Sequence, residues 1–332
     1  LHALLQEQRL ERGIEMKIVL LEPLGVSKEK IEKLVESFVK AGHEFTPYYT
    51  LAADEVEQLE RVKDADVIIM ANHPLTSGVI EQCENLKYIS VAFVGIDHIG
   101  KDACQAKGIN ISNAAGYCDD AVAELSIGLA MDCLRNISAV NDVIRHGGTK
   151  DGLVGHELRG RTVGVIGTGR IGRAAARLFK DFGCQLLGYS RTARSDAEAE
   201  GIRYVSLDEL LTQSDIVTIH TPLTDETKNL ISKDKIALMK NTAILINTSR
   251  GPVVDNAALA EALNEGRLAG AGIDVFDGEP PLAEDYPLLH AKNAVCTSHV
   301  GFATIESIDR RAEIVFDNVA KWMEGTVQNK ML

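Results

Sequence analysis

From residue 16 onward, short apolar runs alternate with longer amphipathic stretches. The runs at 66–70 and 88–92 are almost wholly apolar, as in strands buried on both faces of a sheet. The amphipathic stretches have helical spacing, and strands that alternate with helices indicate parallel β/α layers. The strands expected in this first series are 17–21, 43–48, 66–70 and 88–92, and the helices include 27–41 and 54–62.

A second β/α series begins at residue 162, after a glycine-punctuated loop over 153–160. Between the two series, residues 119–145 carry apolar side chains at helical spacing, and Asp119 or Asp120 suits the N-cap. We expect one long core or interface helix here, ending at His146. The strands expected in the second series are 162–166, 185–189, 216–220, 243–247, 270–274 and 294–297, and a closing helix is expected over 307–323.

Residues 164–172 read Gly-Val-Ile-Gly-Thr-Gly-Arg-Ile-Gly and lie between a predicted strand and a predicted helix. That context favours a dinucleotide-binding loop over a plain glycine turn. Gly167 allows the tight turn, Gly169 lets the backbone approach a pyrophosphate, and Gly172 lets the helix pack close to the strand. The helix N-terminus then offers N–H groups and a positive dipole end to the phosphates.

Composition narrows the functional class. The 332 residues are 45% hydrophobic and 25% charged, which is ordinary for a globular protein, and suggest about two domains. A net charge of −13 disfavours nucleic acid and anionic membranes as partners, and no apolar run reaches membrane-spanning length. Six scattered cysteines predict neither a metal site nor disulfides, and favour the cytoplasm. Residues 1–15 lack a signal-peptide core and are taken as a cloning remnant or an upstream extension.

The second strand of the later series lacks the acidic residue that usually follows it in NAD-binding proteins. That carboxylate binds the ribose 2′-hydroxyl group. Here Ser190 stands at its position, Arg191 follows and Arg194 is close. Because a carboxylate repels a 2′-phosphate and an arginine pairs with it, the sequence predicts that NADP(H) is preferred. NAD(H) stays compatible if Arg191 is only a solvated surface residue.

Three further segments, 247–251, 272–280 and 297–301, each follow a strand, where α/β sheets place their ligands. An arginine such as Arg250 can bind a carboxylate with two hydrogen bonds. A histidine such as His299 can donate a proton near neutral pH, and a carboxylate such as Glu279 favours its charged form. Each residue alone is more often structural, but the set suits reduction of a 2-oxo acid.

These segments, with the glycine loop and His220-Thr-Pro-Leu-Thr224, resemble the D-isomer-specific 2-hydroxyacid dehydrogenase family from about residue 16 to the C-terminus. The resemblance implies an α/β fold of two β/α domains. A flavodoxin-like substrate domain would comprise residues 16–115 and 303–332. A Rossmann NAD(P)-binding domain, residues 116–302, would be inserted into it. The family also implies a homodimer in which the long helix contributes to the interface.

The resemblance assigns roles to individual residues. The family's catalytic arginine, glutamate and histidine fall on Arg250, Glu279 and His299, and Asp274 falls near the nicotinamide. The substrate-binding residues are expected to be Val94, Gly95, Arg250 and His299, with backbone N–H groups of the 94–98 loop on the substrate carboxylate. The cofactor-binding residues are expected to be Gly167, Gly169, Arg170, Ile171, Gly172, Ser190, Arg191, Thr192, His220, Thr221, Pro222, Thr227, Thr248 and Asp274.

Two positions depart from the usual family pattern. Ser298 replaces the proline that usually precedes the catalytic histidine, which could loosen that loop. The pair Ser190-Arg191 resembles the NADPH-using glyoxylate and hydroxypyruvate reductase branch, so we expect an NADPH-dependent reductase of a small 2-oxo acid. The alternatives are a dinucleotide-sensing scaffold, like the corepressors that share this fold, and a phosphoglycerate dehydrogenase-like enzyme. The latter would lack the regulatory domain, since the chain stops at Leu332.

Overall fold

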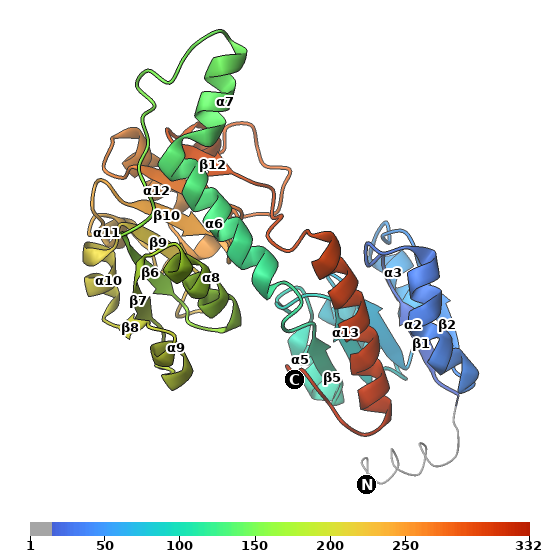
Figure 1. Ribbon diagram of the computed structural model, residues 1–332. Helices are drawn as coiled ribbons and strands as arrows, with labels where there is room; N and C mark the ends of the chain where they lie inside the picture. The colour runs from blue at the N-terminus through green and yellow to red at the C-terminus, as the bar shows by residue number, and fades with distance from the viewer. Residues whose placement is uncertain (1–14) are drawn as a thin grey trace. The chain divides into compact units, whose positions relative to one another are not determined.

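The computed structural model describes residues 15–332, which form two compact units (Figure 1). Unit 1 comprises the described residues up to Tyr117 together with Thr304–Leu332, and unit 2 comprises Cys118–Ala303. The chain therefore leaves unit 1 once and returns to it, so unit 2 is inserted into the sequence of unit 1. The expectation for residues 1–15 lies, except for Glu15, outside the described residues.

The described part of unit 1 contains a parallel five-stranded sheet with the strand order β2-β1-β3-β4-β5. This is the flavodoxin-like order, and it confirms the fold class expected for this part of the chain. Strands β3 and β4 lie inside the sheet and are wholly buried. The elements are β1 Lys17–Leu20, α2 Lys28–Lys40, β2 Glu44–Pro47, α3 Glu55–Val62, β3 Val67–Met70, α4 Ser77–Gln82, β4 Tyr88–Val91, α5 Lys101–Lys107 and β5 Asn110–Asn113.

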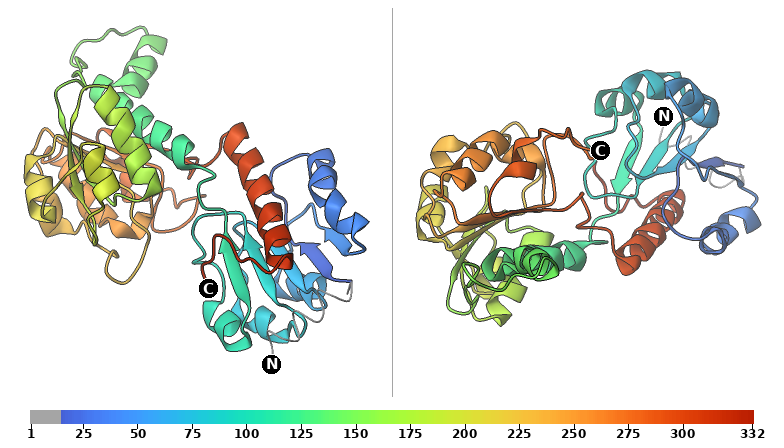
Figure 2. Two further views of the ribbon diagram at one scale, coloured as in Figure 1. Left: turned by 60° about the horizontal axis from the view of Figure 1, so that its bottom comes forward. Right: turned by 90° about the horizontal axis from the view of Figure 1, so that it is seen from above.

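The last helix of the chain, α13 (Ile305–Met323), belongs to unit 1 and packs against β3, β4, β5 and α2. Figure 2 shows α13 and α2 on one face of the sheet, with α3, α4 and α5 on the other. The ring of Trp322 stacks on Tyr88 at 4.8 Å between centroids. The buried side chain of Asn318 donates to the Asn113 carbonyl at 2.9 Å. These contacts join the C-terminal helix to the sheet formed by residues 17–113.

Unit 2 contains a parallel seven-stranded sheet, among the described residues, with the order β12-β11-β10-β9-β6-β7-β8. Counted from β6, its first six strands follow the Rossmann order 3-2-1-4-5-6, which confirms the second part of the fold prediction. The strands are β6 Thr162–Ile166, β7 Gln185–Tyr189, β8 Arg203–Tyr204, β9 Ile216–Ile219, β10 Ile244–Asn247, β11 Gly270–Ile273 and β12 Ala294–Cys296.

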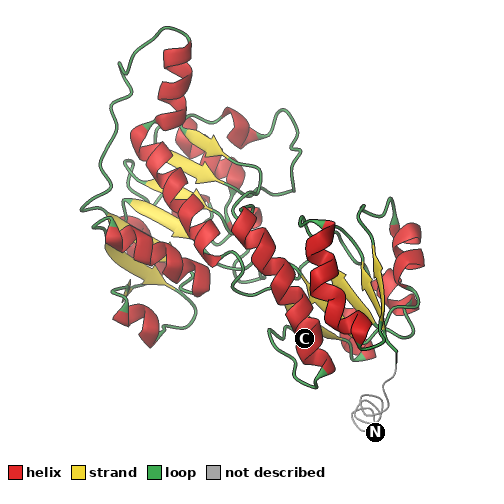
Figure 3. Cartoon of the chain, turned by 45° about the vertical axis from the view of Figure 1, so that its right-hand side comes forward, coloured by secondary structure: helices red, strands yellow, loops and turns green. Residues whose placement is uncertain are grey.

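Helices cover both faces of the unit 2 sheet (Figure 3). One buried apolar cluster joins the sheet to α6, α8 and α9, and a second joins it to α10, α11 and α12. No helix of residues 15–332 is long and apolar enough to cross a membrane. The helical elements are α6 Asp119–Arg135, α7 Ile137–Arg145, α8 Arg170–Asp181, α9 Ser195–Ala199, α10 Leu207–Gln213, α11 Lys233–Ile236, η1 Gly251–Val253, α12 Asn256–Asn264 and η2 Pro287–His290.

The prediction of one long helix over 119–145 is wrong. The helix breaks at Asn136, whose φ of 54° lies in the left-handed region that asparagine tolerates. The break is held by hydrogen bonds, because the Asn136 side chain donates to the Leu153 carbonyl at 3.1 Å and Asp132 accepts the Ser138 N–H at 2.8 Å. Helix α6 is deeply buried, whereas α7 has no buried residue.

Strand β5 is absent from the sequence-based prediction, because Asn110-Ile-Ser-Asn113 has no apolar run. The structure buries Ser112 and Asn113 all the same. The Ser112 hydroxyl donates to the Gln328 carbonyl at 2.6 Å, and the strand pairs with the C-terminal residues around Lys330. Tertiary hydrogen bonds therefore make these polar residues suitable for a buried strand.

Candidate active site

The sequence-predicted residues of unit 2 lie at one edge of its sheet. Because every described strand pair in this sheet is parallel, the carboxyl ends of the strands share that edge. Segments that follow β6, β7, β9, β10, β11 and β12 therefore come together there, as in other α/β proteins that bind ligands at strand ends. Val94 and Gly95 follow β4 and lie at the carboxyl edge of the separate unit 1 sheet.

The glycine loop after β6 has the shape that a pyrophosphate requires. A Cβ atom on Gly172 would lie 1.9 Å from the Gly167 carbonyl oxygen, and one on Gly167, whose φ is 90°, would lie 2.6 Å from the His220 carbonyl oxygen. A Cβ atom on Gly169 would meet no described atom within 4 Å. Gly169 is also the N-cap of α8, so the open position adjoins the N–H groups of the helix's first turn.

Two buried polar atoms beside this loop have no hydrogen-bond partner among residues 15–332. They are the Nδ1 atom of His220 and the Oγ1 atom of Thr221. The other ring nitrogen of His220 bonds the Thr218 hydroxyl at 2.9 Å, and burial lowers the pKa of the imidazole to about 4. Buried polar groups normally have partners, so two without one next to a glycine cradle fit a bound dinucleotide.

The end of β7 carries Ser190 and the exposed Arg191. The Thr224 hydroxyl, the backbone and the nearby charge of Arg191 hold the pKa of Glu226 below its usual value. Arg194 is committed elsewhere, because its Nε and Nη2 atoms reach the two carboxylate oxygens of Asp196 at 3.1 and 3.2 Å. Arg194 is therefore held by Asp196, whereas the side chain of Arg191 is exposed.

Three of the remaining cofactor candidates have side chains that bond other groups of the protein. The Arg170 guanidinium pairs with the Asp119 carboxylate at 2.7 Å. The Thr248 hydroxyl bonds Ser126 at 3.0 Å, and the Thr227 hydroxyl donates to the Pro222 carbonyl at 2.6 Å. These hydroxyls fix neighbouring loops within the protein. Thr192 is exposed, and Ile171 is half-buried.

His299 and Glu279 form a hydrogen-bonded pair. The His299 Nδ1 atom lies 3.0 and 2.9 Å from the two Glu279 carboxylate oxygens. The Nδ1–H group of His299 donates this hydrogen bond to the carboxylate, which leaves Nε2 as the ring nitrogen that can exchange a proton with a substrate. The His299 side chain is 19% exposed and that of Glu279 is 66% exposed. The pair has the arrangement expected of a general acid and the group that orients it.

Asp274 holds the His299 loop. Its buried carboxylate accepts the Thr297 hydroxyl at 2.6 Å and the backbone N–H groups of Val300 and Gly301 at 2.8 Å each. Its carbonyl accepts the His299 N–H at 2.8 Å. These bonds sustain a left-handed φ of 55° at His299, which is unfavourable for a histidine in isolation. The family resemblance places Asp274 near the nicotinamide, but its carboxylate contacts point to a positioning role.

Arg250 stands at the end of β10 in a loop that Asn247 shapes. The Asn247 side chain donates to the Arg250 carbonyl at 3.0 Å and accepts the Ser249 N–H at 3.0 Å. Asparagine commonly stabilises turns in this way. The half-buried Arg250 guanidinium bonds the Ser249 carbonyl at 2.8 Å. Sequence reasoning gave Asn247 no role of its own, although an asparagine at the end of a buried strand is a signal for such a turn.

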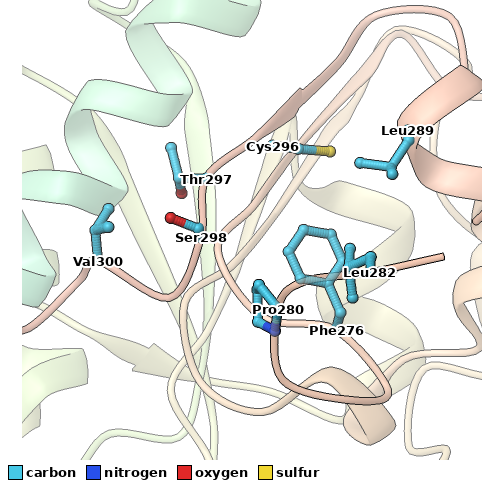
Figure 4. A pocket seen from close by; sticks show the side chains of 8 residues that line it. All are labelled: Phe276, Pro280, Leu282, Leu289, Cys296, Thr297, Ser298 and Val300. Carbon is cyan, nitrogen blue, oxygen red and sulfur yellow. The ribbon is translucent and has the colours of Figure 1, made fainter. Parts of the chain in front are cut away.

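A cavity of about 410 Å³ lies against the residues that flank the His299–Glu279 pair. Pro280 follows Glu279, and Ser298 and Val300 flank His299 (Figure 4). The rest of the wall is mostly apolar, with the Cys296 sulfur directed toward Leu289. This wall offers no cationic side chain, so it does not suit the carboxylate of a substrate.

The comparisons with known proteins agree with this geometry. The family model described as D-isomer specific 2-hydroxyacid dehydrogenase, NAD binding domain, matches residues 127–301. The chain is 39% identical to a glyoxylate reductase of Korarchaeum cryptofilum over 276 residues, 81% of this chain and 83% of that protein. It is 34% identical to a hydroxypyruvate reductase of Blautia hydrogenotrophica over 289 residues, 84% of this chain and 89% of that protein.

Among solved structures, an acyclic imino acid reductase in complex with NADPH and D-Arg superposes with a TM-score of 0.86. It is 27% identical and covers 96% of this chain and 100% of that chain. The chain belongs to the D-isomer-specific 2-hydroxyacid dehydrogenase family, which confirms the resemblance found in the sequence. It is an NAD(P)-dependent oxidoreductase that interconverts a 2-oxo acid and a 2-hydroxy acid.

The buried His220 predicts a specific loss of stability in acid. The pKa of its imidazole is about 4 in the folded protein, against 6.5 for an ordinary histidine. Between these values the unfolded chain binds a proton that the folded chain does not, so stability falls as the pH drops from 6.5 toward 4. The effect amounts to about 2 kcal/mol at pH 5. We expect His220→Gln to lose less stability than the wild type between pH 7 and pH 5.

Urea unfolding at both pH values measures this difference. His146→Gln is the matched control, because the His146 side chain is 76% exposed. Its stability should follow the pH dependence of the wild type. An equal acid loss in His220→Gln and in the wild type would show that His220 does not carry the effect.

Proposed function

We propose that this enzyme reduces a small 2-oxo acid of the glyoxylate or hydroxypyruvate type to its D-2-hydroxy acid, with NADPH as the preferred reductant. The observation that carries the proposal is the His299–Glu279 pair, at the same sheet edge as Arg250 and the glycine loop. Relatives named glyoxylate reductase and hydroxypyruvate reductase support the substrate class.

Each of the chain's own groups has a separate task in this reaction. Arg250 binds the substrate carboxylate through its guanidinium, and this fixes the orientation of the adjacent carbonyl. His299 donates a proton from Nε2 to the oxygen of that carbonyl as it becomes an alkoxide. Glu279 holds the ring and balances its positive charge. A bound NADPH, held by the Gly167–Gly172 loop, supplies the hydride. In unit 1, Val94 and Gly95 offer backbone N–H groups to the carboxylate.

The substrate class is tested by following NADPH oxidation with a panel of 2-oxo acids, from glyoxylate and hydroxypyruvate to longer ones. We expect turnover with the small acids.

We expect His299→Ala to reduce kcat by ~10²–10⁴, because the alkoxide loses its proton donor. NADPH affinity, measured by fluorescence titration, should not change. Arg250→Ala should raise KM for the 2-oxo acid sharply and also slow the reaction.

His156→Ala provides the matched control, since His156 is an exposed histidine of the same unit. Its kcat and KM should equal those of the wild type. Near-normal turnover in His299→Ala would refute the assignment of the proton donor. Silence of the wild type across the whole panel would refute the proposed reaction and favour a dinucleotide-sensing scaffold.

The preference for NADPH rests on the strand end that follows the glycine loop. Ser190 stands at the position where an acidic side chain would repel a 2′-phosphate. The exposed Arg191 can pair with a 2′-phosphate. Arg194 is held by both oxygens of Asp196. The similar imino acid reductase was solved with NADPH, which is consistent with this preference.

Substitutions at this strand end should shift the cofactor preference from NADPH toward NADH. We expect the double change Ser190→Asp with Arg191→Ala to lower the ratio of kcat/KM for NADPH over NADH by ~10–100-fold, the range of one charge-assisted interaction. Arg194→Ala is the control and should leave the ratio within about threefold, because its guanidinium already pairs with Asp196. A wild-type enzyme that prefers NADH would contradict the cofactor proposal.

We also propose that the enzyme is a cytoplasmic homodimer. Helix α7 stands out from the rest of unit 2 and has no buried residue (Figure 1). Ile137 and Ile144 lie on one face of this helix, seven residues apart, and are 53% and 62% exposed. An apolar helix face of this kind is typical of a surface that a second copy covers. The scattered cysteines, with no disulfide spacing, support the reducing compartment.

The dimer is tested by the mass of the protein in solution, measured by light scattering. We expect twice the chain mass for the wild type and the monomer mass for Ile144→Asp, because a charge on this face opposes its burial. Val39→Asp, at a 53% exposed valine of α2, should stay dimeric. A wild-type monomer, or an Ile144→Asp protein that remains dimeric, would remove α7 as the interface.

A further inference from the structure

Two successive backbone carbonyls of the loop after β4 are held by the end of β5. The Phe93 carbonyl accepts the Ala114 N–H at 3.0 Å. The Val94 carbonyl accepts the side-chain amide of Asn113 at 2.7 Å. Both carbonyls therefore point toward the same strand, which successive residues of an extended chain do not do. The chain bends over residues 92–94 to permit it.

Asn113 is fixed in one orientation. Its side-chain oxygen accepts the Ala115 N–H at 3.2 Å, so the amide nitrogen is the atom that faces Val94. Its backbone carbonyl accepts the Asn318 amide at 2.9 Å, and its N–H donates to the Asn329 carbonyl at 3.1 Å. The residue is 4% exposed. Both backbone groups and both side-chain polar atoms are engaged, so the amide cannot turn away from the Val94 carbonyl.

The direction of the carbonyls decides the direction of the next N–H groups. Both peptides are trans, and in a planar trans peptide the N–H points opposite to the C=O. The N–H groups of Val94 and Gly95 therefore point away from β5, on the same side of the loop. Within residues 15–332, neither N–H donates to a protein acceptor. Two adjacent N–H groups with a common direction make a small anion-binding concavity.

We propose that Asn113 is the positioning residue that aims the Val94 and Gly95 N–H groups at the substrate carboxylate. This inference rests on the proposed function, in which those two groups bind a 2-oxo acid. Asn113 does not touch the substrate in this role. It fixes the peptide that joins Val94 to Gly95, so its loss changes substrate affinity before it changes the chemistry at His299.

Asn113→Asp separates this role from general support of the fold. An aspartate keeps the oxygen that accepts the Ala115 N–H, and loses only the donor to the Val94 carbonyl. It also places a negative charge behind the two N–H groups, which opposes a carboxylate in front of them. We expect KM for glyoxylate to rise ~10–100-fold, with kcat within about threefold and KM for NADPH unchanged.

Asn293→Asp is the matched control. The Asn293 side chain also donates to a backbone carbonyl, that of Ala269 at 3.0 Å, but it belongs to unit 2 and follows η2. The same chemical change there should leave KM for glyoxylate unchanged. Asn113→Ala removes the donor without adding charge, and should raise KM in the same direction but less. All variants are assayed below their unfolding midpoints, with NADPH affinity as the check on folding.

The results distinguish this inference from the proposed function. A wild-type enzyme that reduces no 2-oxo acid refutes the proposed function. An active wild type together with normal KM for glyoxylate in both Asn113 variants refutes the positioning role alone. A parallel loss of NADPH affinity, or a fall in kcat with KM unchanged, also refutes it, because neither results from turning the Val94–Gly95 peptide.

Discussion

The orientation of His299, the proposed proton donor, depends on the hydrogen bonds that the buried carboxylate of Asp274 accepts. A carboxylate 1% exposed is stable only if hydrogen bonds replace its water, and Asp274 receives them from one hydroxyl and two backbone N–H groups. All three donors belong to residues 297–301. The hydrogen bonds that stabilise the buried carboxylate therefore also fix the fold of the loop that carries His299. They offset the strain of the left-handed φ at His299.

The same device recurs at other strand ends. Asn247, at the end of β10, uses its side chain to shape the loop that carries Arg250. Asn113, at the end of β5, holds the loop that carries Val94. In each case a buried polar residue, which has to find partners, finds them in the backbone of an adjacent loop. Because strand ends are rigid, these hydrogen bonds hold the adjacent loops in defined positions, although the loops lack regular structure.

Hydrophobic periodicity was enough to predict most of the fold. Apolar runs predicted both parallel sheets, and the glycine spacing predicted the turn before α8, where a Cβ atom on Gly172 has no room. Periodicity failed to predict the local structure where tertiary hydrogen bonds determine it. The break at Asn136 and the strand around Ser112 depend on partners more than ten residues away, which no local pattern reveals. The roles of the candidate site residues stay predictions, although His299 and Glu279 do meet.

Ser298 shows why a departure from the family pattern need not loosen the loop. A proline there would restrict the backbone directly, by fixing φ. Serine removes that restriction, but the loop is held on both sides of the position. Thr297 before it and Val300 after it bond the same carboxylate oxygen of Asp274, and the His299 N–H bonds the Asp274 carbonyl. The freedom of one residue is small when its neighbours are fixed to one buried group, so the orientation of His299 depends on Asp274 more than on residue 298.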